Sequence, residues 1–392
     1  MRCINVYMKQ YDVIIIGAGA AGLSAARTAI ARGRRVVVLD MGAAPARKVM
    51  ASGGGRCNFT NTAAASDRYF GQNPEFVRSA LARVSPDDIL KWMQNHNLEY
   101  VEKAPGQYFC ASGAADVVDA LTHDANGAKI VLNATVLNIS KRDDTFIIQT
   151  QNDLFTGKSV IIATGGISFP TLGVSDLGYK IAKQFGHKIV PVRPALCAIA
   201  TNVFSPELAG ISIPVEIRIG RARINDSLLF THFGIGGPAV YRATVRDIGD
   251  DICINLLPRI DVYEFLRNAK RTDGRKSLQN ILAAELPLRL ARWIAGTDVK
   301  NIADYKDTEL KNIVNRICNI IIPRAAIKLH GMPSAEVVRG GVATVDVSSK
   351  TMESKFCTGL YFAGEVLDIA GDLGGFNLQW AWASGIVAGM NA

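Results

Sequence analysis

The fold of this chain is decided by residues 11–40, which read YDVIIIGAGAAGLSAARTAIARGRRVVVLD. Residues 11–17 predict a short buried strand that ends in glycine, residues 20–32 an alanine-rich helix, and residues 35–40 a second strand. A strand, a helix and a parallel strand form a βαβ unit with a right-handed crossover. The chain therefore begins as an α/β domain built on a parallel sheet.

The turn of this βαβ unit has the sequence Gly17-Ala18-Gly19-Ala20-Ala21-Gly22, a G-x-G-x-x-G pattern. Gly17 permits the tight turn, Gly19 lets the backbone approach a pyrophosphate, and Gly22 lets the helix pack closely on the strand. The helix N-terminus, which starts at Ala20 and Ala21, then attracts the phosphate charge. Asp40 ends the second strand, where an acid binds ribose hydroxyls. The stretch predicts a bound dinucleotide, with simple helix–strand packing as the alternative.

Three later segments favour FAD over NAD as this dinucleotide. Residues 129–139 read as a strand that can lay a backbone group beside adenine, with Val136 as the contact. The small residues Ala163-Thr164-Gly165 end another buried strand, as expected where a second segment passes near the pyrophosphate. Gly364-Glu365 places a glycine and an acid after a strand near the C-terminus, where they suit a ribityl chain. An ordinary NAD dehydrogenase has no need of this last element.

A glycine pair precedes the final helix, in Gly374-Gly375-Phe376-Asn377, and the helix is expected to begin just after it at Leu378. Its free N–H groups and positive dipole end can face the N1/O2 edge of the flavin and stabilise the reduced anion. Simple C-terminal packing is the alternative. Arg47, Lys48 and Arg56 flank a glycine-rich loop and could neutralise phosphate or reach the flavin rim; solvated surface charge is the alternative for each.

The predicted elements divide the chain into a discontinuous dinucleotide domain and an insertion. The dinucleotide-binding domain covers residues 1–193 and 334–392. Short strands with turns fill residues 194–258, and helical patterns fill residues 259–333. The fold class predicted is therefore α/β, a Rossmann-like domain of the glutathione-reductase type interrupted by a β-rich and a helical subdomain.

Three further motifs carry a family resemblance: ASGGGRCNFT at residues 51–60, LFTHFGIGGP at 229–238 and GDLGGFNLQWA at 371–381. With the segments above they closely resemble the YhiN/BaiN-like flavoproteins, over nearly the whole chain. The resemblance implies a FAD domain with an inserted pair of barrel-like and helical subdomains. It also implies that the loop Ser52–Asn58, with Gly54, Gly55, Arg56 and Asn58, and the segment Gly374–Leu378 contact the flavin.

Two side chains are candidates for proton transfer to a substrate. Cys57 lies in the flavin loop, and an unperturbed thiol with a pKa near ~8.5 is mostly protonated at neutral pH. His232 lies in a glycine-rich turn of the insertion, and histidine exchanges protons near neutrality. A small buried cysteine and a structural hydrogen bond are their respective alternatives. Only one G-x-G-x-x-G is present, so NAD(P)H would have to visit the flavin transiently.

Composition limits the remaining classes. The seven cysteines are scattered without a Cys-x-x-Cys pair, so neither zinc nor a disulfide framework is indicated, and a reducing cytoplasm is expected. The apolar run 13–26 is too short to cross a membrane, which needs roughly 20 residues. The net charge of +9 suits an anionic cofactor, or alternatively a polyanionic partner such as RNA. No Gly-x-Ser-x-Gly, His-Glu-x-x-His or Walker sequence supports a hydrolase, zincin or ATPase.

Three functions remain open. The family resemblance, strengthened by EKAPGQYFC at residues 102–110 as in the enterobacterial type, implies reduction of uridine to dihydrouridine in 23S ribosomal RNA. Residues 194–333 hold 19 Lys+Arg against 14 Asp+Glu, a net charge of +5 that suits RNA. Phe59, Tyr69 or Phe169 could stack on the base once it has left its helix. The alternatives are a small-molecule oxidoreductase, of the enone-reducing or amine-oxidising type, and a non-catalytic, flavin-loaded RNA-binding factor.

Overall fold

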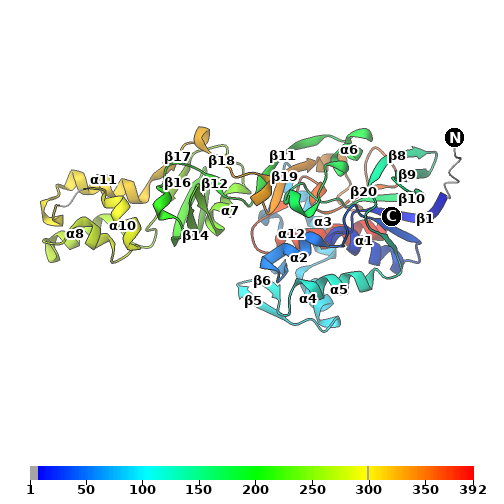
Figure 1. Ribbon diagram of the computed structural model, residues 1–392, viewed down its shortest axis with the longest axis horizontal. Coiled ribbons are helices and arrows are strands. Elements are labelled where there is room, and N and C mark those ends of the chain that lie inside the picture. Colours follow the sequence, from blue (N-terminus) through cyan, green and yellow to red (C-terminus); the bar gives the residue numbers. More distant parts are fainter. Residues whose placement is uncertain (1–7, 298–299) are drawn as a thin grey trace. The chain divides into compact units, whose positions relative to one another are not determined.

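The computed structural model describes residues 8–297 and 300–392, which form two compact units (Figure 1). Unit 1 comprises residues 8–194 and 336–392, and unit 2 comprises Ala195–Ala335. The predicted boundaries at 193 and 334 lie next to those of the structure. Each unit has its own hydrophobic core, so each is described by itself.

The core of unit 1 is a seven-stranded sheet in the order β7-β2-β1-β10-β9-β8, with β20 also paired to β10. Its strands are β1 Met8–Ile16, β2 Val36–Leu39, β7 Lys129–Val131, β8 Val136–Arg142, β9 Thr145–Thr150, β10 Leu154–Ile162 and β20 Leu360–Phe362. The first half of β10 pairs with β9 antiparallel, and its second half pairs with β20 in parallel. The expected Rossmann-like sheet is confirmed, and the C-terminal strand β20 completes it.

Apolar runs explain the centre of this sheet. Residues 13–16 of β1 are all buried, and they pair in parallel with β2 on one side and β10 on the other. Strands that helices cover on both faces read as such continuous apolar runs. The helix α1, Ala20–Ala31, follows β1 and ends before Gly33, whose φ of 76° closes the helix in the left-handed region. The predicted βαβ unit is therefore present.

The last helix, α12, spans Phe376–Asn391 and packs directly on α1. A Cβ atom at Gly385 would lie 2.3 Å from the Ala21 carbonyl oxygen, and one at Gly389 would lie 2.4 Å from the Ala25 carbonyl oxygen. The two helices thus meet backbone to backbone, at a distance that only glycine on α12 permits. Because α12 is apolar on nearly every face, it is buried along almost its whole length.

Shorter elements surround the main sheet of unit 1. Its other helices are α2 Arg47–Ala51, α3 Arg78–Arg83, α4 Pro86–Asn95, α5 Ala114–Asp124 and α6 Leu177–Gln184. A three-stranded sheet has the order β3-β6-β5, and two strand pairs join β4 to β21 and β11 to β19. These strands are β3 Asn58–Asn61, β4 Tyr69–Phe70, β5 Tyr100–Ala104, β6 Gln107–Cys110, β11 Ile189–Ala195, β19 Val337–Val342 and β21 Ala370–Gly371.

Unit 2 combines a seven-stranded sheet, in the order β17-β16-β13-β14-β15-β12-β18, with five helices among its described residues. The strands are β12 Ile199–Ala200, β13 Ser212–Ile219, β14 Ala222–Thr231, β15 Gly234–Gly236, β16 Ile252–Asn255, β17 Ile320–Ile322 and β18 Lys328–Leu329. The helices are α7 Pro238–Thr244, α8 Val262–Thr272, α9 Leu278–Leu282, α10 Leu288–Ala295 and α11 Asp307–Cys318. Apolar faces of the sheet and the helices share one core.

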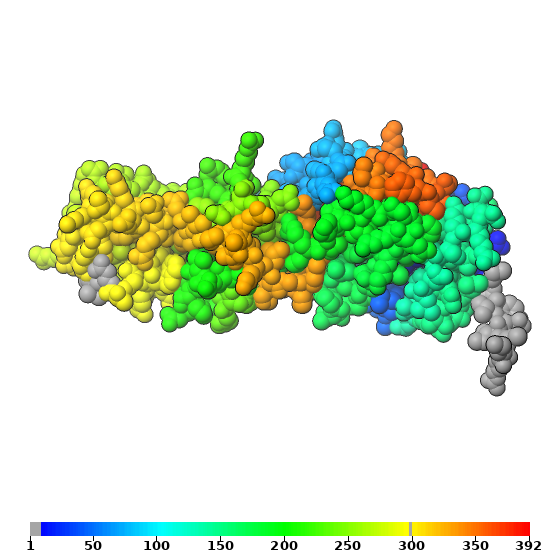
Figure 2. Space-filling model, turned by 90° about the horizontal axis from the view of Figure 1, so that it is seen from above, coloured from blue at the N-terminus to red at the C-terminus, as the bar shows by residue number. Residues whose placement is uncertain are grey.

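The prediction that residues 259–333 are a helical subdomain is corrected at its C-terminal end. After α11 the chain returns to the sheet of unit 2 as β17 and β18, in the segment coloured yellow to orange in Figures 1 and 2. The physical reason is local: β17 consists of three isoleucines, and β-branched side chains favour a strand.

Within the described residues, no helix is long and apolar enough to cross a membrane.

The α1–α12 contact predicts the effect of a single methyl group. Gly385→Ala should lower the free energy of unfolding by about 1–3 kcal/mol, because overpacking displaces backbone that has no rotamer to change. Urea unfolding measures this difference. Gly249→Ala is the matched control, because a Cβ there meets nothing within 4 Å; it should leave stability unchanged or slightly raised. Equal unfolding midpoints for the two variants would contradict the close contact.

Candidate functional site

The N-terminus of α1 is shaped to receive an anion. Gly17 has φ of 112°, and a Cβ there would lie 2.3 Å from the carbonyl oxygen of Ala163. A Cβ at Gly22 would lie 1.8 Å from the carbonyl oxygen of Gly17, whereas a Cβ at Gly19 would meet nothing within 4 Å. Within the described chain, no acceptor is recorded for the amides of residues 19–22. Open space before free N–H groups fits a phosphate.

Asp40 ends β2 beside this turn, as predicted. One of its carboxylate oxygens accepts from the Ala18 N–H at 2.7 Å, and the other accepts from the Gly42 N–H at 2.7 Å and pairs with Arg47 at 3.2 Å. A carboxylate has about four acceptor positions, so about one remains for a ribose hydroxyl. The carboxylate is thereby fixed in orientation at the mouth of the phosphate space.

Arg47 occupies a different place from the one expected of a phosphate ligand. Its guanidinium group lies between the Asp40 carboxylate and the carbonyl oxygens of Leu172 and Gly173. These contacts tie the segment that follows β10 to the segment that follows β2. In the structure Arg47 therefore braces two loops of the site.

The segment around Val136 lies beside Asp40. Ala134 N–H donates to the Asp40 carbonyl oxygen at 2.8 Å, and Asn133 N–H donates to the Gly42 carbonyl oxygen at 2.9 Å. Val136 itself is buried at the start of β8. The structure thus joins the residues just before Val136, predicted to contact adenine, to the backbone of Asp40, the acid predicted to contact ribose.

The ends of β10 and β20 reach the same region. The Ala163 N–H donates to Ile16 at 2.9 Å, and Thr164 and Gly165 follow it, with φ of 73° at Gly165. Gly364 lies between the two long helices of unit 1: a Cβ there would lie 2.9 Å from Ala21. Two side chains of α12 form hydrogen bonds with the backbone of Gly364. The Gly364 N–H donates to Ser384 Oγ at 2.9 Å, and Trp380 Nε1 donates to the Gly364 carbonyl oxygen at 3.2 Å.

Lys48 and Glu365 form an ion pair, with 2.8 Å between Lys48 Nζ and Glu365 Oε2. The Lys48 ammonium also donates to Ser168 Oγ at 2.7 Å. The Glu365 carboxylate accepts further bonds from the N–H groups of Gly166 and Val338, at 3.3 and 3.0 Å. A ribityl hydroxyl would therefore have to replace a protein donor on Glu365, and Lys48 is committed to this pair rather than to a phosphate.

The glycine-rich loop after α2 adopts a conformation that glycine alone adopts easily. Gly53, Gly54 and Gly55 have φ of 59°, 65° and 81°, and a Cβ at either of the last two would meet nothing within 4 Å. Arg56 is exposed, and no anionic partner is recorded for it within the described residues. The loop therefore offers bare backbone, and one available cation, to a planar ligand.

The start of α12 is the second free helix N-terminus. The structure places it at Phe376, two residues before the predicted start at Leu378, because Gly375 with φ of 93° ends the preceding turn. Within the described residues no acceptor is recorded for the N–H groups of Phe376, Asn377 and Leu378. In the orientation that satisfies its whole amide, Asn58 accepts from the Gly375 N–H at 3.2 Å. The glycine-rich loop and α12 are thus joined directly.

The side chains of Phe376 and Asn377 serve the protein rather than a ligand. The Phe376 ring is buried, edge-on to Tyr69. The Asn377 side chain accepts from the Gly371 N–H at 2.8 Å and donates to the Gly371 carbonyl oxygen at 3.0 Å. What this segment presents to a ligand is consequently its backbone amides.

Sequence reasoning missed the buried polar residues that hold these segments together. Asn61 donates to the Gly374 carbonyl oxygen at 2.8 Å, and Gln379 accepts from Thr60 Oγ1 at 2.6 Å and donates to the Val84 carbonyl oxygen at 2.9 Å. The available signal was a polar residue inside an otherwise apolar helix, because a buried polar group must be hydrogen-bonded. Gln379 and Ser384 both match that description.

The two proton-donor candidates lie in different units. Cys57 is 0% exposed beneath the glycine-rich loop, and burial raises the pKa of its thiol to about 12, opposed by a hydrogen bond to Ser52 and assisted by Cys110. A thiol with no exposed surface has no path to a substrate carbon, so the structure favours the packing role. His232 is exposed in the turn between β14 and β15 of unit 2. Among the described residues, no group of three metal-binding side chains is found.

Unit 1 therefore brings together two helix N-termini, an acid at the end of β2 and a bare glycine loop. The positive ends of α1 and α12 stabilise negative charge. An extended ligand with a diphosphate at α1 and a planar, anion-forming ring near α12 matches this arrangement. The chemistry of the donor set thus fits a flavin nucleotide.

Comparison with known proteins agrees with this geometry. Residues 11–391 match the model of the family described as "HI0933-like protein Rossmann domain". The chain is 38% identical to the "Ribosomal RNA dihydrouridine synthase" of Escherichia coli strain K12, over 96% of both chains. It is 41% identical to the protein of the same name from Haemophilus influenzae, over 96% of this chain and 97% of the relative.

A more distant relative has a different name. The chain is 29% identical to the "3-dehydro-bile acid delta(4,6)-reductase" of Clostridium scindens, over 96% of this chain and 98% of that protein. Among solved structures, a 3-ketosteroid-delta4-(5alpha)-dehydrogenase from Rhodococcus jostii, in complex with 4-androstene-3,17-dione, superposes with a TM-score of 0.50 at 13% identity. It covers 100% of this chain and 97% of its own, and this likeness shows the fold.

The open space at Gly19 gives a test of the cofactor site. Gly19→Glu should fold normally, because its Cβ meets nothing, yet lose cofactor affinity by roughly 100-fold or more, because like charges repel in the phosphate space. Flavin absorbance per folded protein, with circular dichroism for the fold, measures this. Gly249→Glu is the control for an added charge in open space and should stay yellow. A yellow Gly19→Glu variant would place the phosphates elsewhere.

The buried thiol gives a second test. Because the pKa of Cys57 is raised to about 12, its thiolate stays negligible as pH rises from 7 to 9, and the folded protein should not be alkylated there. Iodoacetamide labelling with peptide mass spectrometry checks this, with the half-exposed Cys253 as internal comparison and urea-unfolded protein as positive control. Labelling of Cys57 as fast as that of Cys253 would show that the thiol is accessible and could serve as a proton donor.

Proposed function

The chain belongs to the HI0933-like protein Rossmann domain family and is a flavin-dependent oxidoreductase, and from this premise we propose that it binds FAD and reduces uridine to dihydrouridine in 23S ribosomal RNA. The observation that carries the proposal is that α1 and α12, which pack on each other backbone to backbone, each begin with N–H groups for which no acceptor is recorded among the described residues. The 38–41% identity to two relatives named for this reaction supports the choice of substrate.

FAD is proposed because the protein offers suitable groups to both halves of a dinucleotide. Asp40 and the Val136 segment suit the adenosine half, and the amides before Gly22 suit the diphosphate. The amides of residues 376–378 suit the flavin half, because a helix N-terminus stabilises an anion at the edge of the ring. The isoalloxazine group supplies the hydride when it is reduced. We propose that NAD(P)H binds transiently beside the flavin and donates the electrons.

The chain's own residues bind and orient in this scheme. The glycine-rich loop lets backbone approach the ring closely, and Asn58 fixes that loop to Gly375. Lys48 and Glu365 brace the strand ends around the middle of the cofactor. Hydride adds to one carbon of the uracil double bond and a proton to its neighbour, so the base is reduced by one hydride and one proton. With Cys57 fully buried, that proton comes from another group or from water.

The positive charge of the chain supports an RNA substrate. Two of the three predicted stacking residues, however, are wrong. The net charge of +9, of which +5 lies in residues 194–333, attracts phosphate. Phe59 is 0% and Tyr69 2% exposed, so both rings belong to the core and cannot stack on an extruded base. Phe169 is half-buried, with φ of 54°.

A small-molecule reductase is the second candidate, and one observation favours it. The relative from Clostridium scindens, named for a steroid reduction, aligns over almost its whole length at 29% identity. Reduction of an enone needs the same hydride and proton as reduction of uracil, so the cofactor site serves either substrate. Because the similar proteins are named as enzymes, the non-catalytic alternative has no observation in its favour.

A deletion strain tests the proposed reaction. Ribosomal RNA from the strain should lack one dihydrouridine, wild-type protein supplied in trans should restore it, and Gly19→Glu should not, because that variant cannot hold the hydride source. Nucleoside and oligonucleotide mass spectrometry measures dihydrouridine directly. Gly249→Glu should restore it as well as wild type.

The contrary result is equally concrete. Unchanged dihydrouridine in the deletion strain removes the RNA proposal. If anaerobically reduced protein is then reoxidised by an α,β-unsaturated ketone without RNA, the second candidate takes its place.

A further inference from the structure

Unit 2 carries an exposed stacked pair of rings that no part of the proposed cofactor site uses. Phe233 and His330 lie parallel, with ring centroids 3.9 Å apart and planes at 12°. The Phe233 side chain is 41% exposed, and His330 is exposed as well. With the exposed neighbours His232 and Lys328, these residues form what we call the Phe233 platform.

The backbone holds both rings in place. The Thr201 N–H donates to the Phe233 carbonyl oxygen at 2.9 Å, and the His330 N–H donates to the Ala198 carbonyl oxygen at 2.9 Å, so both ring-bearing residues are bonded to the same stretch of chain around β12. A hydrogen bond of 3.0 Å between His330 Nδ1 and Ser334 Oγ orients the imidazole. The platform is therefore prepared before any ligand arrives.

A comparison within the chain shows that this arrangement is particular. Phe356 in unit 1 is even more exposed, at 57%, and also lies beside a histidine, His187. There the planes are tilted by 57°, with centroids 5.1 Å apart, and His187 is buried. Only a parallel, exposed pair presents a flat face on which a further planar ring can continue the stack.

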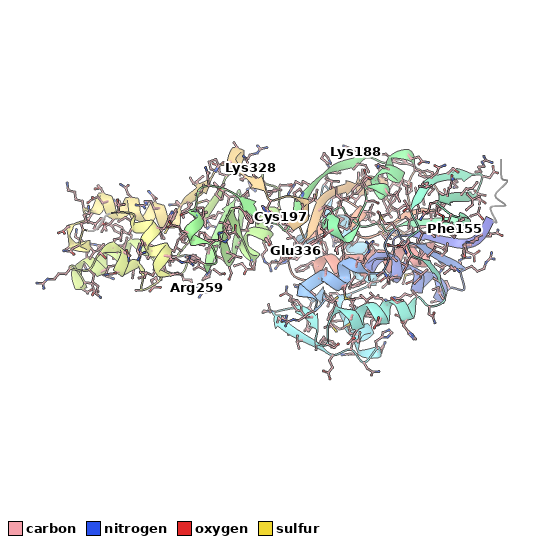
Figure 3. The ribbon with its side chains drawn as sticks, viewed as in Figure 1. Phe155, Lys188, Cys197, Arg259, Lys328 and Glu336 are labelled. Atoms are coloured by element: carbon pink, nitrogen blue, oxygen red, sulfur yellow. The ribbon has the colours of Figure 1, made fainter. Side chains whose placement is uncertain are left out.

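The surroundings of the platform favour a planar ring attached to negative charge. Lys328, marked in Figure 3, is exposed in β18, Lys328–Leu329, and His330 directly follows this strand. No carboxylate partner is recorded for Lys328 or His232 within the described residues. Between residues 222 and 236 the exposed large apolar side chains are Leu229 and Phe233, whereas a stable protein interface buries ~800 Å² on each partner.

We infer that the Phe233 platform is a stacking site for an unpaired base of RNA. Single-stranded RNA offers a planar base that can stack on the two rings and a phosphate that can pair with Lys328. The choice of RNA over another planar anion rests on the proposed function; the platform residues belong to unit 2 and the proposed cofactor residues to unit 1. Its role is to hold the substrate RNA by stacking on one of its nucleotides.

Binding of oxidised, FAD-loaded, full-length protein to a fluorescein-labelled single-stranded oligouridylate tests this inference. Phe233→Ala should weaken binding by about five- to 100-fold, because stacking on an aromatic ring contributes this much per base. Phe233→Trp should bind at least as tightly as wild type. Phe356→Ala, an exposed phenylalanine beside a histidine outside the platform, is the matched control and should bind normally. Flavin content and thermal midpoint confirm that each variant is folded.

The outcomes separate this inference from the proposed function. Unchanged affinity of a folded Phe233→Ala variant overturns the platform, even if the deletion strain shows that the protein makes dihydrouridine. Loss of affinity in Phe233→Ala but not Phe356→Ala supports the platform, even if ribosomal dihydrouridine proves independent of this chain. If Phe233→Ala instead abolishes binding of a protein partner or turnover of an enone and leaves RNA affinity unchanged, the inference fails.

Discussion

The contact between α1 and α12 is the constraint on which the rest of unit 1 depends. Gly385 and Gly389 bring the backbone of the last helix against Ala21 and Ala25 of the first, closer than any side chain permits. This contact packs the two helices on each other, and among the described residues no acceptor is recorded for the first N–H groups of either helix. Segments from the two ends of a chain of 392 residues are thereby joined, and both contribute to the cofactor site that we propose.

Polar side chains hold several of the loops of the proposed site in place. Ser384 and Trp380 hold Gly364, Asn61 holds Gly374, and Lys48 with Glu365 closes the gap between strand ends. Because buried polar groups are costly when unpaired, each of these bonds specifies one loop conformation rather than adding much net stability. The exposed Arg56, for which no anionic partner is recorded among the described residues, follows the glycine-rich loop.

Unit 2 follows a different logic, because its core is closed without any residue of the cofactor site. Its sheet buries one face against α7 and packs with the helices α8–α11, which leaves charged residues and the Phe233 platform on the surface. The platform rests on strands β12, β15 and β18, whose residues are far apart in sequence. The proposed cofactor site and the proposed RNA-stacking site therefore lie in units that each have their own hydrophobic core.

The sequence by itself determined the βαβ start, the dinucleotide motif, the insertion and the two glycine-rich segments, because each depends on local rules: apolar period, glycine at positive φ, and an acid after a strand. Only the tertiary structure decided which partners the candidate side chains contact. Arg47 forms an ion pair with Asp40 and Lys48 with Glu365, whereas Phe59 and Cys57 are buried in the core. The strands β17 and β18 join a sheet that begins more than a hundred residues earlier in the chain. The Phe233–His330 stack likewise joins residues 97 positions apart. Such pairings are set by which segments the fold brings together, and one sequence read along its length does not carry that information.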